Sequence, residues 1–329
     1  MVTKQKTERL TIANIVAIVG VVLLGVFSFL GRSYMSGGEL SWDIVMSVAI
    51  TAFTVFLLWF LIKAKGAENY LDNWKKAEFA ALGIYIVFAI PVSLWGGIMH
   101  FFVVNDQKDS IKEYAKADLQ KIDELFAEYK DFESVALSVT STGLQNATGP
   151  GQVWDESLNK FMEQNNISHS RESAENFATI QRNNLINSGF ETIHNSFKAE
   201  RNEIESVVNS WSVMQIPFKA KRIDELAEYV GKELSDLSHK AKLPVIIYGS
   251  DGKYKIDDDN QCRSFSIRGG LDSFEFKEHI KNASGFSVTA LLVVLLIHLL
   301  ILFNYIVAYR TSTIAVGKGF EEDGGRILD

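Results

Sequence analysis

Four long runs of apolar residues dominate the chain and are unevenly spaced along it. Three lie within the first 104 residues and the fourth lies near the end, with the polar residues 105–285 in between. A bilayer core of about 30 Å needs roughly 20 apolar residues in a helix, because unpaired backbone amides are costly in hydrocarbon. The pattern therefore predicts an α-helical polytopic membrane protein with four transmembrane helices, over residues 10–30, 44–62, 79–104 and 286–309.

Lysine and arginine near the ends of these helices predict the orientation, because they accumulate in cytoplasmic connections. They occur in residues 1–9, in the connection after the second helix and in the tail 310–329, whereas the first connection has only Arg32. We expect both termini to be cytoplasmic and residues 105–285 to form an extracytoplasmic domain. No acidic or basic residue lies inside the four predicted helices.

Helical spacing dominates the first part of the polar segment. Apolar residues recur every three or four positions from Ile111 to Tyr129, which predicts an amphipathic helix that continues the third transmembrane helix without a break to Leu137. A turn-rich loop over 138–152 should end this helix. A short helix over 153–163, a long helix ending before Pro217 and a further helix ending before Pro244 should follow.

The period changes to two at Val245. Residues 245–256 predict two short strands about a turn at 250–252, and the alternation over 263–268 is compatible with a third strand. A last helix from about Leu271 should lead into the fourth transmembrane helix. The extracytoplasmic domain is therefore expected to be mainly α-helical, with a small β-hairpin element near 245–268.

Charge and cysteine content limit the expected partners and the expected location of the protein. Residues 105–285 hold 22 Lys and Arg against 30 Asp and Glu, so the acidity of the chain is concentrated there. A basic surface is the usual footprint of nucleic-acid binding, so nucleic acid is not an expected partner. The single cysteine, Cys262, allows no intrachain disulfide. Extracellular animal domains often carry disulfides, so we expect the bacterial inner membrane.

The densest acidic cluster is Asp257, Asp258 and Asp259, which are the candidate ligands for a cation such as Ca²⁺. The cluster lacks the glycine and the glutamate that an EF-hand loop has at its sixth and twelfth positions. We favour a solvated loop, and we expect neither a metal nor another cofactor.

His298 falls at the centre of the fourth predicted helix, where a polar group is costly and usually faces other helices. One interpretation is a proton relay or gating contact. A relay needs partners, so we favour a neutral histidine that makes a hydrogen bond to a neighbouring helix. Candidate kinks or hinges are Pro91, Gly96 and Gly97 in the third helix and Gly285 before the fourth.

No catalytic or phosphate-binding motif stands out, so we expect a non-enzymatic protein. The leading hypothesis is an inner-membrane subunit of a multi-protein envelope assembly, such as a secretion, motor or transport machine, which docks other envelope or membrane proteins through its helical domain. Self-association stays open. One alternative is a ligand-sensing transducer that acts through a partner protein, and another is an oligomeric channel or pore. A buried pocket with convergent polar groups would favour the transducer.

Overall fold

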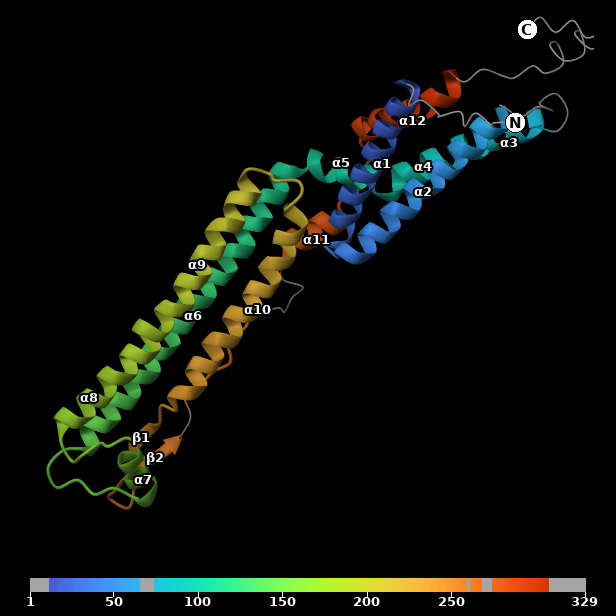
Figure 1. Ribbon diagram of the computed structural model, residues 1–329. Coiled ribbons are helices and arrows are strands. Elements are labelled where there is room, and N and C mark those ends of the chain that lie inside the picture. Colours follow the sequence, from blue (N-terminus) through green and yellow to red (C-terminus); the bar gives the residue numbers. More distant parts are fainter. Residues whose placement is uncertain (1–11, 66–73, 259–260, 268–273, 308–329) are drawn as a thin grey trace, which may run out of the picture. The chain divides into compact units, whose positions relative to one another are not determined.

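The computed structural model describes residues 12–65, 74–258, 261–267 and 274–307 (Figure 1). The chain divides into two compact units. We call residues 1–111 and 279–329 the apolar unit, and residues 112–278 the polar unit.

The apolar unit contains four helices, among the residues described, that are long and apolar enough to cross a membrane. Each differs by a few residues at its ends from the predicted range. Their bounds are Ile12–Ser36 for α1, Leu40–Lys65 for α2, Lys75–Asp106 for the third and Val288–Val307 for α12. We call the third the segmented helix, because it consists of α3 (Lys75–Ile84), η2 (Tyr85–Ala89), α4 (Ile90–Ser93), η3 (Leu94–Ile98) and α5 (Met99–Asp106).

Large apolar side chains point outward as well as inward on these helices. Val22 of α1, Val48 of α2 and Leu292 of α12 are each more than half exposed. Leu24 and Leu61, in contrast, are fully buried in a cluster that also includes residues of the segmented helix and α12. An outward apolar surface on all sides is what a helix bundle in hydrocarbon requires, whereas a water-soluble bundle hides such residues.

The segmented helix departs from α geometry in two places. Its segments η2 and η3 are π-helical turns that lie on either side of Pro91. Within η3, Gly97 has φ 153° and ψ −38°, a conformation that side chains strongly disfavour. A Cβ atom added to Gly31 of α1 would overlap the backbone of Gly97, so the two helices meet backbone to backbone.

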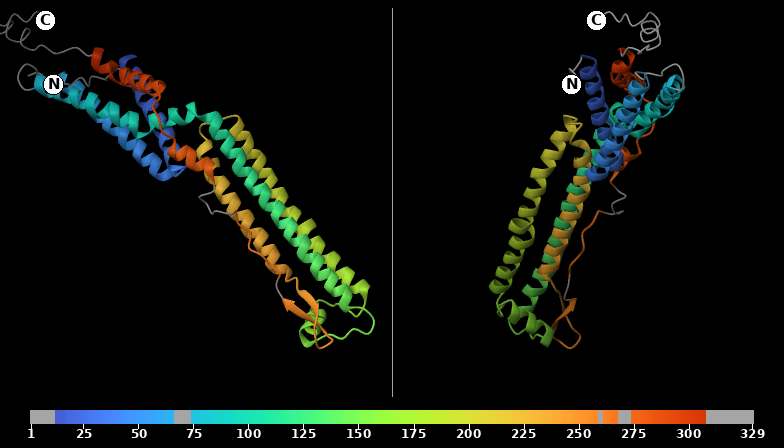
Figure 2. Two further views of the ribbon diagram at one scale, coloured as in Figure 1. Left: turned by 180° about the vertical axis from the view of Figure 1, so that it is seen from behind. Right: turned by 45° about the vertical axis from the view of Figure 1, so that its right-hand side comes forward.

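The polar unit is built mainly from long helices (Figure 1, Figure 2). Here α6, α9 and α10 run alongside one another, and rings of α6 and α9 meet between them, as Phe126 does with Phe190 and Phe197. The bounds are α6 Lys108–Ala147, α7 Glu156–Gln164, α8 Arg171–Arg182, η4 Asn183–Asn187, α9 Ser188–Asn209, α10 Ile216–Ala241 and α11 Glu275–Asn282.

Two predictions about α6 were wrong. The predicted continuous helix is interrupted at Gln107, which has φ −98° and ψ 8°. The predicted loop over 138–152 is instead helical as far as Ala147. Leu144 and Ala147 are fully buried in a cluster with Trp154 and Leu158, so packing overrides the weak helix preference of the Ser- and Thr-rich sequence.

The predicted hairpin is present. Strand β1 (Val245–Tyr248) pairs antiparallel with β2 (Tyr254–Asp258), and Ile246 faces Ile256 across the pair. The possible third strand was placed over 263–268; the described part, 263–267, is not a strand, and residue 268 lies outside the described residues. We call residues 261–267 the strap, because they lie along α10 and form hydrogen bonds with its side chains.

The strap keeps the predicted alternation without a sheet. Phe265 is 4% exposed, whereas Ser264 and Ser266 are exposed. The Phe265 N–H donates to Ser235 Oγ over 2.7 Å. A serine side chain of α10 is therefore the hydrogen-bond acceptor that a neighbouring strand would provide in a sheet. A Cβ added to Gly231 of α10 would lie 2.8 Å from the Phe265 carbonyl oxygen, so this glycine permits the close approach.

Candidate functional site: buried polar contacts of the apolar unit

His298 lies in α12 and is 2% exposed. Its Nδ1 atom is 2.8 Å from the hydroxyl oxygen of Tyr85, and the two rings meet edge to face with centroids 5.4 Å apart. Tyr85 is the first residue of η2 and is fully buried. The contact satisfies one ring nitrogen of His298 where unpaired polar atoms are costly. The other, Nε2, is buried and has no hydrogen-bond partner in the part of the chain that the structure describes.

A second pair, which is partly buried, lies one heptad away on both helices. The Tyr305 hydroxyl donates to Glu78 Oε1 over 2.5 Å, and Glu78 is 1% exposed. Tyr85 follows Glu78 by seven residues, and Tyr305 follows His298 by seven. In antiparallel helices, a step forward along one is matched by a step back along the other. The two pairs are therefore successive contacts of one interface between the segmented helix and α12.

Two further contacts join α1 and α2 to the same end of α12. Lys65 Nζ donates to the Tyr305 carbonyl oxygen over 2.6 Å and lies 4.7 Å from the centroid of the Tyr305 ring. Asn304 Nδ2 donates to Asn14 Oδ1 over 2.5 Å. The predicted helices contained no acidic or basic residue, but the observed helices extend further and include Lys65 and Glu78.

These contacts fix which side chains of neighbouring helices face each other. A hydrogen bond between helices in a membrane contributes about 0.6–2 kcal/mol, so a set of them selects one register among several apolar alternatives. The contact of Tyr85 also lies in a π-helical turn, a feature that is frequent at functional sites. The arrangement can thus hold one helix register.

The other candidate residues are not gathered around His298. Asp257 and Asp258 are exposed at the end of β2, and Asp259 lies outside the described residues. Among the residues that the structure places, no group of three His, Cys, Asp or Glu side chains is arranged to hold a metal ion.

The candidate hinge residues have different surroundings. Pro91 lies in the short helix α4, between the two π-helical turns. Gly96 packs against α2, where an added Cβ would lie 2.8 Å from Cδ1 of Ile50, and Gly97 is the non-helical residue of η3. Gly285 has φ 151° in the connection between α11 and α12, so it too has a conformation that favours glycine.

A buried carboxyl in the polar unit could not be recognised from the sequence. Glu133 of α6 is 0% exposed, and neither carboxyl oxygen makes a well-formed hydrogen bond within the described residues. Burial raises the pKa of Glu133 above its ordinary value, while a weak interaction with the Ser238 hydroxyl and the charge of His239 lower it to a smaller extent. On the sequence alone, Glu133 looked like one more acidic residue of an amphipathic helix.

Asp118 of α6 is a second buried carboxylate that the sequence did not single out. It accepts the N–H groups of Glu275 over 3.2 Å and of Phe276 over 2.9 Å, and so caps the start of α11. Nearby, Asp224 of α10 pairs with Lys277 of α11 at 2.9 Å. Burial raises the pKa of Asp224, while Lys277 partly offsets this rise. These contacts depend on helix positions that the sequence does not specify.

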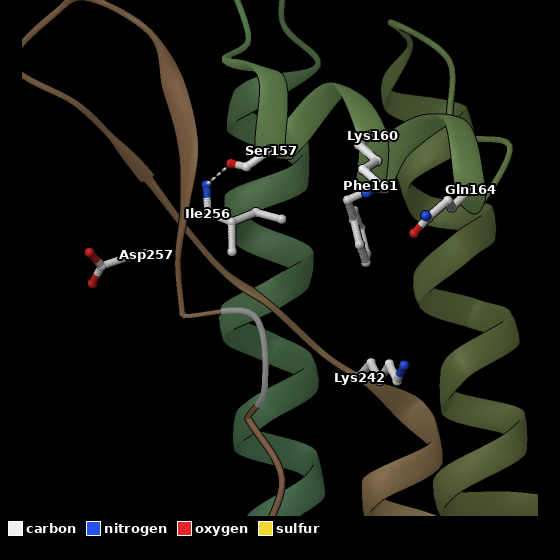
Figure 3. Close-up of a pocket in the computed structure, with 7 residues that line it drawn as sticks. All are labelled: Ser157, Lys160, Phe161, Gln164, Lys242, Ile256 and Asp257. Carbon is white, nitrogen blue, oxygen red and sulfur yellow. Dashed lines mark hydrogen bonds between the residues drawn. The ribbon is translucent and has the colours of Figure 1, made fainter.

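The polar unit also contains a cavity of about 480 Å³ beside the hairpin (Figure 3). Residues of α7 form one wall, β2 forms another, and the residue after α10 completes it. Its lining is Ser157, Lys160, Phe161, Gln164, Lys242, Ile256 and Asp257.

No protein-family model, curated protein or solved structure matches this chain.

Proposed function

We propose that this chain is a non-enzymatic, multi-pass subunit of a protein assembly in the bacterial inner membrane, and that it docks partner proteins through its polar unit. The observation that supports this proposal is the pair of contacts, Glu78 with Tyr305 and Tyr85 with His298. They join the segmented helix to α12, the two helices between which the polar unit is inserted in the sequence. A domain held at both ends by helices in one register is suited to presenting a docking surface.

The proposed orientation places both termini in the cytoplasm and residues 105–285 outside. Support comes from the lysines and arginines of the short connections, of which only Arg32 lies on the other side. Cys262 offers a direct test, because it is the only cysteine and is partly exposed. A membrane-impermeant maleimide should label it in intact spheroplasts.

The matched control for this labelling is Ser312→Cys in a Cys262→Ser background. That cysteine should react only after the membrane is permeabilised. Labelling of Ser312→Cys, but not of Cys262, in intact spheroplasts would reverse the proposed orientation.

Assembly is tested by in-cell cross-linking, extraction in mild detergent and purification through a C-terminal tag, with identification of the co-purifying proteins and measurement of the particle mass. A photo-reactive residue at Val135 or Ile180 would sample the exposed surface of the polar unit, since these side chains are 64% and 57% exposed. The same residue at Leu292 of α12 is the control for contacts of the apolar unit. Stoichiometric partners cross-linked at Val135 or Ile180 would support the proposal. A lone monomer or a pure homo-oligomer would refute it.

A second candidate function is a ligand-sensing transducer that acts through a partner protein. The cavity beside the hairpin supports it in part, because polar side chains of two elements converge there, although its polar lining residues are exposed rather than buried. In this case, a bound ligand should change hydrogen exchange in peptides from α5 and α12. Unchanged exchange at saturating ligand would refute transmission to these helices.

A further inference from the structure

We propose that the cavity beside the hairpin binds a small organic anion that carries a phosphate or carboxylate group on an apolar body. The cavity volume of about 480 Å³ is in the range of small-molecule sites. Its lining combines two lysines and other polar groups with two apolar side chains.

One face of α7 supplies most of the lining. Ser157, Lys160, Phe161 and Gln164 are spaced by three and four residues, so a helix presents them on the same side. The Lys160 ammonium, the Gln164 amide and the Ser157 hydroxyl give this face several hydrogen-bond donors. Ser157 already donates to Asp155 over 2.7 Å, which leaves Lys160 and Gln164 as the principal donors for a ligand.

Lys242 provides a second cation from another element. It follows the last residue of α10 and lines the cavity across from α7 (Figure 3). Neither Lys160 nor Lys242 forms an ion pair or hydrogen bond with the residues that the structure describes. Two unpaired ammonium groups at one cavity favour an anion locally, against the net negative charge of residues 105–285.

The acidic residue of the lining does not cancel this charge. Ile256 and Asp257 are consecutive in β2, and side chains of consecutive strand residues point to opposite faces. Figure 3 shows the Asp257 carboxylate on the far side of β2 from Phe161 and Lys242. Ile256 and Phe161 lie on the cavity side and supply an apolar wall, which is why the ligand should have an apolar body.

The backbone of Lys242 is an independent sign that this lysine has a role. It has φ 45° and ψ 54°, the left-handed conformation that glycine usually supplies after a helix. A side chain other than glycine or asparagine costs roughly 1 kcal/mol there. Lysine is therefore unfavourable for the backbone at this position, whereas it is useful for holding an anion.

The test uses the full-length chain in a neutral detergent at low salt. Phenyl phosphate, inorganic phosphate and phenol are titrated into it by isothermal calorimetry. Phenyl phosphate should bind saturably and more tightly than inorganic phosphate, and phenol should not bind. The variant Lys242→Gly removes the charge and suits the left-handed backbone, so it should keep or raise the melting temperature. It should weaken phenyl phosphate binding by about tenfold, and Lys160→Gln should do the same.

Lys253→Gln is the control, because Lys253 is exposed in the hairpin turn and does not line the cavity. It should bind as the natural chain does. The proposal would be overturned by an absence of saturable binding, by equal binding of phenol and phenyl phosphate, or by unchanged affinity in a folded Lys242→Gly, Lys160→Gln double variant. The existence of this site does not depend on the proposed function. Only the effect of ligand binding on the rest of the chain rests on the transducer function. Failure to bind would refute the site, whereas co-purification tests the assembly separately.

Discussion

Replacing Glu133 by methionine should stabilise the protein. Both carboxyl oxygens of Glu133 are buried without a well-formed hydrogen bond among the described residues, Ser238 interacts with the carboxyl only weakly, and the side chain is 0% exposed. A buried polar group that lacks a partner costs about 1–3 kcal/mol, and methionine has a similar length without the polar oxygens. For a unit of this size, each kcal/mol shifts the melting temperature by about 2–4 °C. Glu133→Met should therefore melt about 2–12 °C higher at neutral pH.

The gain should depend on pH in a definite direction. Burial raises the pKa of Glu133 in the folded chain above the ordinary value of 4.5. Between these two values the folded state holds a proton that the unfolded state has lost, so the stability of the natural chain falls as pH rises. Methionine does not titrate, so its advantage should be smallest below about pH 4.5 and should grow as pH rises through the raised pKa.

The assay is thermal unfolding of the full-length protein in detergent, followed by tryptophan fluorescence at several pH values from 5 to 8. Glu133→Gln removes the charge and keeps the shape, so it should show a smaller gain with little pH dependence from this position. Glu113→Met is the control, because Glu113 is exposed on the same helix. A gain from Glu133→Met that is the same at pH 5 and pH 8, or a loss of stability in both Glu133 variants, would refute this account of the buried carboxyl.

Three further predictions concern helix and strap contacts, and all use thermal unfolding in detergent. Tyr85→Phe should lower the free energy of unfolding by about 1–2 kcal/mol, and His298→Leu should lower it less in the Tyr85→Phe background than alone. If the two losses of stability are fully additive, the hydrogen bond between Tyr85 and His298 is contradicted. Gly231→Ala should destabilise by about 1–3 kcal/mol because its Cβ would lie 2.8 Å from a strap carbonyl oxygen, and an unchanged melting temperature would argue against that close approach. Gly31→Ala should be more disruptive than Gly25→Ala, whose Cβ would meet only Thr51 Oγ1 at an ordinary 3.5 Å, and equal effects would argue against the backbone contact of Gly31.

Length and hydropathy were sufficient to predict the apolar helices and the hairpin. The four helices are present near their predicted positions, and β1 and β2 flank the predicted turn. These features depend on periodicity within a short stretch of chain.

Features that depend on tertiary neighbours could not be predicted in this way. Residues 138–147 look like a loop by composition, but the burial of Leu144 and Ala147 holds them in α6. The alternation over the strap resembles a strand, and only the serines of α10 show why no sheet is formed. The cavity likewise depends on the approach of α7 to Lys242 and β2, which come much later in the sequence.

The polar pairs of the apolar unit are an intermediate case. Glu78 and Tyr85 are seven residues apart, as are His298 and Tyr305, and this repeat is visible in the sequence. It becomes informative only once the two helices are known to be antiparallel neighbours, because the repeat alone does not say which helix faces which. The sequence did identify His298 as a polar residue that needs a partner. The structure adds that Tyr85 is this partner and that it begins a π-helical turn.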